Sequence, residues 1–265
     1  MFIDVLIATF FFLVGLEIRH GLKDFKSALL PIFAAMGGML VPALIFSILK
    51  PGSNLWATSM PTDIALALGV LSLLGKRVGP QVRLFLLSLA IADDLFSLIV
   101  LGVFYGNELK PEKAVATLGA AALGILMPLG RSHINTMINF LTPISTYFIL
   151  PVIIVVNIPL SVDLDNLTSG TTISLVVARI IGKIAGITLF AWMAIRFGIK
   201  TDVHLNHIAG IGALAGMGMT VSLVIAEIAA INESELNEIR LGLFISAILS
   251  GLLGFFWLRR TLVAK

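Results

Sequence analysis

The sequence predicts an all-α polytopic membrane protein with about nine transmembrane helices. Of its 265 residues, 58% are hydrophobic and only 12% are charged, whereas soluble domains carry about 25% charged residues. The mean hydropathy is +1.05. Apolar stretches of about 20 residues, the length that crosses a bilayer as a helix, recur along the whole chain. Such segments use most of the length, so we expect a single transmembrane domain over residues 1–265.

The expected helices are apolar stretches bounded by charged residues, Pro or Gly. They cover 2–19, 27–49, 57–75, 80–105, 114–129, 137–160, 171–198, 206–231 and 235–259. The segment 114–129 is rich in Ala and Gly and is barely long enough to cross. A re-entrant position of this segment would change the topology.

The charges of the connections predict the orientation, because Lys and Arg collect in cytoplasmic loops. One set of alternate connections carries Arg19, Lys23, Lys26, Lys76, Arg77, Arg83, Arg131, Arg196, Lys200, Arg259, Arg260 and Lys265. The other set carries Lys50, Lys110, Lys113 and Arg240, with the acids Glu108, Glu112, Asp163, Asp165, Glu233 and Glu235. We therefore expect the C-terminus in the cytoplasm and the N-terminus outside.

The composition also excludes several classes of function. The absence of Cys excludes disulfides, thiolate metal sites and a Cys nucleophile. The sequence contains no nucleophile and base set, phosphate loop or cluster of metal ligands, so it predicts neither an enzyme nor a bound cofactor. The net charge of +3 follows from the basic loops, and no basic run with interleaved aromatic residues points to a nucleic-acid partner.

A weak internal symmetry relates residues 27–105 to residues 171–259. Each part contains three expected helices, and the middle helix of each is interrupted. The interruptions are Met60, Pro61, Thr62 and Asp63 in the first part, and Gly212, Gly216, Gly218 and Thr220 in the second. Two repeats of three helices must be inverted in the membrane, and matching breaks point to a binding site near the midplane. Alternatively, the glycines serve close helix packing.

Five ionisable residues, Asp63, Asp93, Asp94, Arg179 and Lys183, lie at membrane depth in this arrangement. Charges there cost a few kcal/mol each and face the protein interior or water. Neighbours on a helix point about 100° apart, so one of Asp93 and Asp94 can face a cavity while the other faces a helix. Two ionised carboxylates repel each other unless a proton or a cation relieves the repulsion. Oxygen ligands suit hard cations such as Na⁺ or Li⁺, which predicts exchange of protons for one of these.

The remaining candidates each have two interpretations. Lys183 is the expected counter-charge of a carboxylate, and Arg179 lies on the same helix face, but both could serve as structural or snorkelling charges. Asp63, next to Thr62, either neutralises helix-end dipoles or ligates the ion. Glu17, at the cytoplasmic edge of the first helix, is either an interfacial cap or a regulatory residue.

Several motifs together resemble the NhaA-type bacterial sodium/proton antiporters. They are residues 10–17 (FFFLVGLE), 62–69 (TDIALALG), 90–94 (AIADD), 182–183 (GK) and 216–220 (GMGMT), in the family's order over nearly the whole chain. The resemblance implies that Asp94 binds the cation and that Asp93 pairs with Lys183 in the proton-loaded state. It also implies that Asp63 balances dipole ends where two interrupted helices cross, with the second break at Gly216, Gly218 and Thr220.

The resemblance further implies electrogenic export of Na⁺ or Li⁺ in exchange for H⁺, by alternating access in a bacterial inner membrane. Residues 27–105 and 171–259 would be the core repeats, and residues 1–26 and 106–170 a reduced panel. The chain has about three helices fewer than is usual in the family, and the hairpin used for homodimer contact has no counterpart. The alternative is therefore a non-transporting or partner-dependent reduced paralogue that keeps the ion-binding core.

The chain also departs from the family pattern within its motifs. Pro61 replaces a small residue, Phe96 and Ser97 replace Gly and Ala, and Ile184 replaces the Pro after the motif lysine. Val115 and Thr142 stand at two family His positions, so strong pH gating is not expected.

Overall fold

The computed structural model describes residues 2–21, 25–106, 111–128, 130–157 and 167–262. All regular structure in these ranges is helical, with no strand. Six helices are long and apolar enough to cross a membrane, or seven if one bent pair counts as a crossing. Several residues of the expected connections, namely Lys23, Glu108, Lys110, Asp163, Asp165 and Lys265, lie outside the described residues.

The expected count of nine crossings is therefore higher than the length and composition of the described helices support. All nine expected segments contain helix, but two of them are not candidate spans. α1 (Phe2–Gly21) carries Asp4, Glu17 and Arg19 within 20 residues. The apolar helix over Val115–Leu126 is shorter than the roughly 20 residues that a crossing needs.

Four long helical segments form the centre of the molecule. They are α2 (Phe25–Leu49), α4 (Pro80–Phe104), the segment from α10 (Gly170–Val177) through the π-helical η6 (Ala178–Gly182) to α11 (Lys183–Arg196), and α14 (Glu233–Thr261). Side-chain caps begin two of them: Ser169 Oγ accepts from Thr172 N at 3.1 Å, and Asn232 Oδ1 accepts from Glu235 N at 2.9 Å. Such caps satisfy amide groups that a helix start leaves free.

Two interrupted elements lie among these long helices. The first consists of the 3₁₀ helix η2 (Asn54–Ser59) and α3 (Ile64–Ser72), which the short turn η3 (Gly75–Arg77) follows. The second consists of α12 (Leu205–Ala215) and α13 (Thr220–Ala229), which are bent by 49° at the break.

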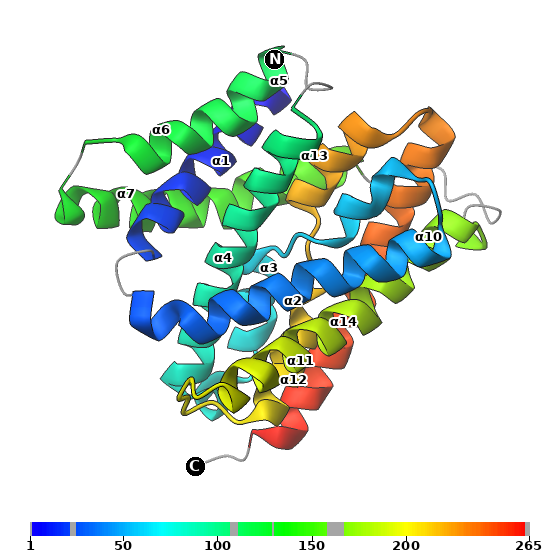
Figure 1. The fold of residues 1–265 in the computed structure, drawn as a ribbon. Helices are drawn as coiled ribbons and strands as arrows, with labels where there is room; N and C mark the ends of the chain where they lie inside the picture. The colour runs from blue at the N-terminus through cyan, green and yellow to red at the C-terminus, as the bar shows by residue number, and fades with distance from the viewer. Residues whose placement is uncertain (1, 22–24, 107–110, 129, 158–166, 263–265) are drawn as a thin grey trace.

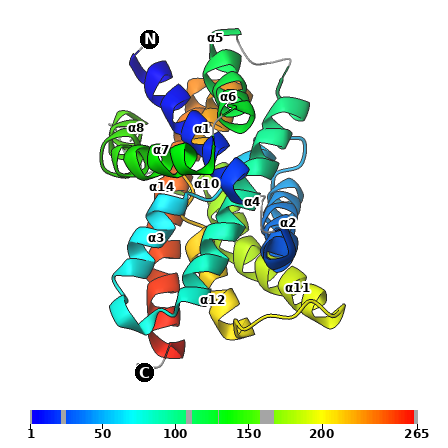
Figure 2. The ribbon, with the colours of Figure 1, turned by 90° about the vertical axis from the view of Figure 1, so that its left-hand side faces the viewer.

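The remaining helices cover one side of this centre (Figures 1 and 2). They are α1, the run of α5 (Pro111–Ala114), η4 (Val115–Gly119) and α6 (Ala120–Leu126), and the run of α7 (Arg131–Ile144), η5 (Ser145–Ile149) and α8 (Leu150–Asn157). An ion pair between Lys113 and Glu227 joins α5 to α13.

α2 and α11 lie side by side along much of their length (Figure 1). Their backbones approach at Gly37 and Gly186, where a Cβ on either glycine would overlap the carbonyl oxygen of the other. Gly15 of α1 and Gly124 of α6 make a similar close approach. Small residues permit such contacts between membrane helices, where packing replaces the hydrophobic effect. Each pair therefore forms a tightly packed backbone contact.

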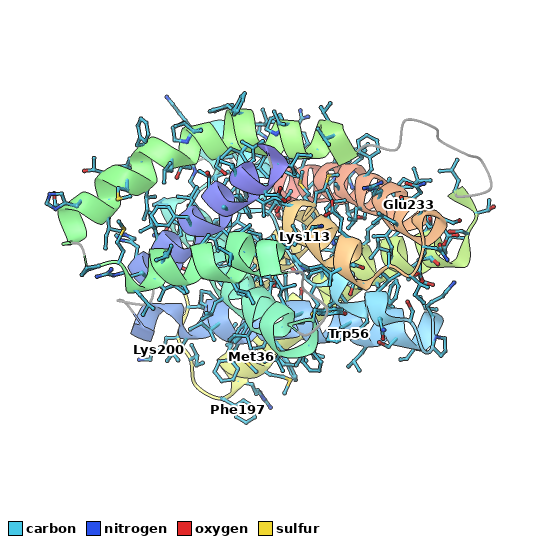
Figure 3. The ribbon with its side chains drawn as sticks, turned by 90° about the horizontal axis from the view of Figure 1, so that it is seen from above. Met36, Trp56, Lys113, Phe197, Lys200 and Glu233 are labelled. Carbon is cyan, nitrogen blue, oxygen red and sulfur yellow. The ribbon has the colours of Figure 1, made fainter. Side chains whose placement is uncertain are left out.

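Large apolar side chains also face outward, as expected for a surface in contact with lipid. Ile48 on α2 is 74% exposed and Leu126 on α6 is 77% exposed. The start of α1 and the end of α14 lie at opposite ends of the molecule (Figures 1 and 2). In Figure 3, Phe197 and Lys200 lie on the opposite side from Glu233. Lys200 of one expected set of connections is thus separated in space from Glu233 of the other.

Candidate cation-binding site

The two helix breaks meet inside the protein. The first break, Met60 to Asp63, separates η2 from α3, and the second lies between Ala215 and Thr220. Thr62 Oγ1 donates a hydrogen bond to the carbonyl oxygen of Ala215 at 2.9 Å. A Cβ at Gly218 would overlap the carbonyl oxygen of Pro61, so only glycine fits there. The two interruptions therefore contact each other backbone to backbone.

Asp63 joins the breaks through its side chain. Its Oδ2 accepts hydrogen bonds from Met219 N at 2.6 Å and from Thr220 N at 3.0 Å. These amides belong to the start of α13, where N–H groups lack helical partners. Asp63 Oδ1 is buried and has no hydrogen-bond partner in the described structure. The carboxylate therefore caps α13 with one oxygen and leaves the other without a hydrogen bond.

Arg179 lies where the two helix breaks meet, a place called the crossing of the breaks from here on. It is fully buried. Its guanidinium donates to the carbonyl oxygens of Thr58 at 2.7 Å, Pro61 at 3.0 Å and Gly216 at 3.2 Å, and also to that of Gly218. A fifth hydrogen bond runs from Nη1 to Ser222 Oγ at 2.9 Å. The side chain leaves the π-helical segment η6, a distortion often found at functional positions.

Lys183, the first residue of α11, pairs with Asp93 of α4. Its Nζ lies 3.3 Å from Oδ2 and 3.4 Å from Oδ1 of Asp93, and both side chains are 1% exposed. Nζ also donates to Thr62 Oγ1 at 2.9 Å. The ammonium therefore connects Asp93 to the first break.

Asp94 faces away from this pair. It lines a cavity of about 400 Å³, together with Glu17 of α1 and Thr62 and Asp63 of the first break. Asp93 does not line this cavity. Ser145 and Thr146 of η5 face it from the covering helices. The two neighbouring carboxylates therefore have different surroundings, one a cavity and the other a buried ammonium.

The cavity is lined by oxygen atoms but does not contain a complete set of metal ligands among the described residues. Among the described residues, no group of three or more His, Cys, Asp or Glu side chains is placed to hold a metal ion. A cation here would rely on Asp94, hydroxyl groups and the Asp63 oxygen that lacks a hydrogen bond. Such ligands suit a hard cation that keeps part of its water.

The chain is similar to known proteins over nearly its whole length. The family profile described as "Na+/H+ antiporter 1" matches residues 1–138 and 113–258. The Na(+)/H(+) antiporter NhaA of Salmonella arizonae is 33% identical, over 98% of this chain and 83% of that protein. The NhaA of Citrobacter koseri is 32% identical over 98% and 82%, and that of Escherichia coli O139:H28 is 33% identical over 97% and 82%. The chain belongs to the NhaA family of Na⁺/H⁺ antiporters.

Membership of the NhaA family makes the chain a multi-pass membrane protein of a transporter family, not an enzyme, and its relatives are bacterial. Na⁺ and H⁺ are the ions that the family transports. The match to the Salmonella protein extends over 322 positions, more than the 265 residues of this chain. The relative therefore contains internal residues that this NhaA-family chain lacks.

Sequence reasoning did not foresee two parts of the site in this NhaA-family chain. It left the role of Arg179 open, because backbone carbonyl acceptors have no sequence signature. It also gave no role to Thr142, Ser145 and Thr146, which line the cavity. The spacing of these hydroxyl residues along one helix face was the signal that could have found them.

Proposed function

We propose that this chain is an electrogenic antiporter that exports Na⁺ or Li⁺ in exchange for protons by alternating access. Asp94 is the main cation ligand, with Asp93, Asp63 and Thr62 beside it, and Lys183 is the charge partner of Asp93. The observation that carries the proposal is the contrast between the two neighbouring acids. Asp94 lines the cavity, whereas Asp93 is bound by Lys183.

Coupling follows from competition at these groups. In the proton-loaded state, Lys183 keeps its proton and pairs with Asp93, and Asp94 carries a proton of its own. A cation that enters the cavity displaces the proton from Asp94 and draws Asp93 away from Lys183. An ammonium without its carboxylate is costly in a buried site, so Lys183 then releases its proton too. More protons than Na⁺ ions move, and exchange is electrogenic.

The arrangement in the membrane is part of the same proposal. The N-terminus would lie outside and the C-terminus in the cytoplasm of a bacterial inner membrane, which requires an odd number of crossings. The cavity reaches Glu17 near the end of α1 and Ser72 at the end of α3, and basic residues of the cytoplasmic set follow both. The described conformation would then be open to the cytoplasm. Residues 27–105 and 171–259 would be the inverted repeats, covered by 1–26 and 106–170.

A second candidate function is a non-transporting or partner-dependent paralogue. The observation that favours it is the length of the chain, since the matched part of the Salmonella relative is longer than this whole chain. Such a protein would keep cation binding at Asp94 without completing a transport cycle.

The test is the dissipation of a pH gradient by Na⁺ and by Li⁺ in proteoliposomes, for the wild type and Asp94→Asn. Asp202→Asn, in an exposed connection, is the matched control. Loss of the response in Asp94→Asn but not in Asp202→Asn supports antiport, and an intact response in Asp94→Asn overturns it. A folded wild type that gains thermal stability with Na⁺ but exchanges nothing supports the second candidate.

A further inference from the structure

Arg179 has the most complete set of polar contacts at the crossing. A guanidinium has five N–H donors, and all five of Arg179 are used: Nε donates to Gly216, Nη1 to Thr58 and Ser222, and Nη2 to Pro61 and Gly218. Among the described residues, no carboxylate forms an ion pair with it. The charge of Arg179 is therefore directed at backbone, not at an acid.

The acceptors are the groups that a broken helix leaves unsatisfied. Thr58 and Pro61 lie at and after the end of η2, while Gly216 and Gly218 follow the end of α12. Carbonyl groups at helix ends carry partial negative charge, and no water satisfies them at membrane depth. Asp63 binds amides at the start of α13. The positive charge of Arg179 therefore binds carbonyl groups at the helix ends, and the carboxylate of Asp63 binds amide groups at a helix start.

Lys183 has different partners. It contacts the Asp93 carboxylate and the Thr62 hydroxyl, and no backbone carbonyl is among its partners in the described structure. Lys183 can therefore change partner, or lose its proton, without leaving a helix end unsatisfied. Arg179, which stays charged in proteins, cannot take part in proton exchange.

We infer that Arg179 is a positioning residue for cation binding: it fixes the two helix breaks as a permanent charge, so that Lys183 is free to serve the exchanging acids. This inference rests on the proposed function. Arg179 itself does not line the cavity. It acts through Pro61 and Gly218, whose backbones adjoin Thr62, Asp63 and the amides that Asp63 binds.

The test compares Arg179→Lys, which keeps the charge but loses the planar set of donors, with Thr188→Val as a polar-to-apolar control on α11. The readouts are the KM for Na⁺, the maximal rate and the amount of folded protein. A positioning role predicts that Arg179→Lys raises the KM about tenfold or more, the expected effect of losing one charge-assisted hydrogen bond, while the maximal rate per folded molecule stays within about twofold. A purely structural role would lower the folded amount and leave the KM unchanged, which would overturn the inference.

If Arg179→Lys does not fold, Ser222→Ala decides, because it removes one acceptor and leaves the arginine in place. An increase in KM of about threefold or more supports the inference, and a KM equal to that of the wild type overturns it. Na⁺ binding, measured as the shift in melting temperature with Na⁺ concentration, separates this inference from the proposed function. A wild type that binds Na⁺ without exchange contradicts antiport, and the same variants then report on Arg179 through the dissociation constant.

Discussion

Thr62 connects Lys183 to the second helix break with a single hydroxyl group. Its Oγ1 accepts a hydrogen bond from Lys183 Nζ at 2.9 Å and donates one to the carbonyl oxygen of Ala215, also at 2.9 Å. The ammonium that pairs with Asp93 is thereby linked to the end of α12. One hydroxyl group therefore separates Lys183 from the second helix break.

This link predicts different outcomes for two substitutions of Thr62. Thr62→Val leaves the buried Ala215 carbonyl unpaired and should lower the free energy of unfolding by about 1–3 kcal/mol. Thr62→Ser keeps the hydroxyl and should cost less than about 1 kcal/mol. Chemical denaturation in detergent measures both values. Equal losses in the free energy of unfolding of the two variants would show that the hydroxyl group does not stabilise the protein.

The Asp93 and Lys183 pair should behave as a unit in a double-mutant cycle. Lys183→Met leaves a buried carboxylate without its cation, at a cost of about 3–5 kcal/mol. Asp93→Asn in the same molecule removes that unpaired charge, so the double variant should regain most of the loss. Thermal unfolding of the four proteins measures the coupling, with Lys200→Met in an exposed connection as the control. Strictly additive losses would contradict a direct interaction.

The contact between the breaks predicts strong sensitivity at Gly218. A Cβ there would overlap the Pro61 carbonyl oxygen and lie 2.7 Å from Arg179 Nη2. We expect Gly218→Ala to separate the breaks and to abolish Na⁺-dependent stabilisation. Gly170→Ala is the control, because nothing lies within 4 Å of a Cβ at that position. Na⁺-induced shifts in melting temperature compare the two, and a normal shift in Gly218→Ala would refute the close contact.

Glu17 should tune cation entry. It lines the same cavity as Asp94, so in its ionised form it attracts cations toward that residue. Glu17→Gln should raise the apparent KM for Na⁺ by about two- to fivefold at low ionic strength, and by less when choline chloride screens the charge. Glu233→Gln, on an exposed residue that does not line the cavity, should leave the KM unchanged. A KM difference that does not depend on ionic strength would exclude an electrostatic role.

The sequence alone located the helices and the buried charges well. Apolar stretches predicted most of the described helices within a few residues, because membrane helices must satisfy their own backbone groups, although α7 begins at Arg131, well before the expected start at 137. The helical rotation between Asp93 and Asp94 indicated that they have different neighbours, and the structure places them so. The count of crossings was less reliable, since α1 and the helix over Val115–Leu126 are marginal in charge or length.

The backbone contacts could not be predicted in the same way. Arg179 binds four carbonyl groups, and every residue has a carbonyl, so no pattern of side chains marks the acceptors. The π-helical turn at Ala178–Gly182 likewise has no clear sequence signal. Both depend on contacts between segments that are distant in the sequence. The spacing of residues along one helix holds no information on such contacts.

The close approach of Gly37 and Gly186 restricts where the protein can move. Because each backbone fills the space of the other's missing side chain, α2 and α11 cannot slide past each other without large steric overlap. The cavity beside Asp94 lies elsewhere, with α1 and η5 on one side and α3 and α4 on the other. The proposed alternating access would therefore use the free volume at this boundary, not the contact between α2 and α11. Access to Asp94 would then change as α1 and η5 move sideways relative to α3 and α4. The two helix breaks would keep their contacts with each other during this movement.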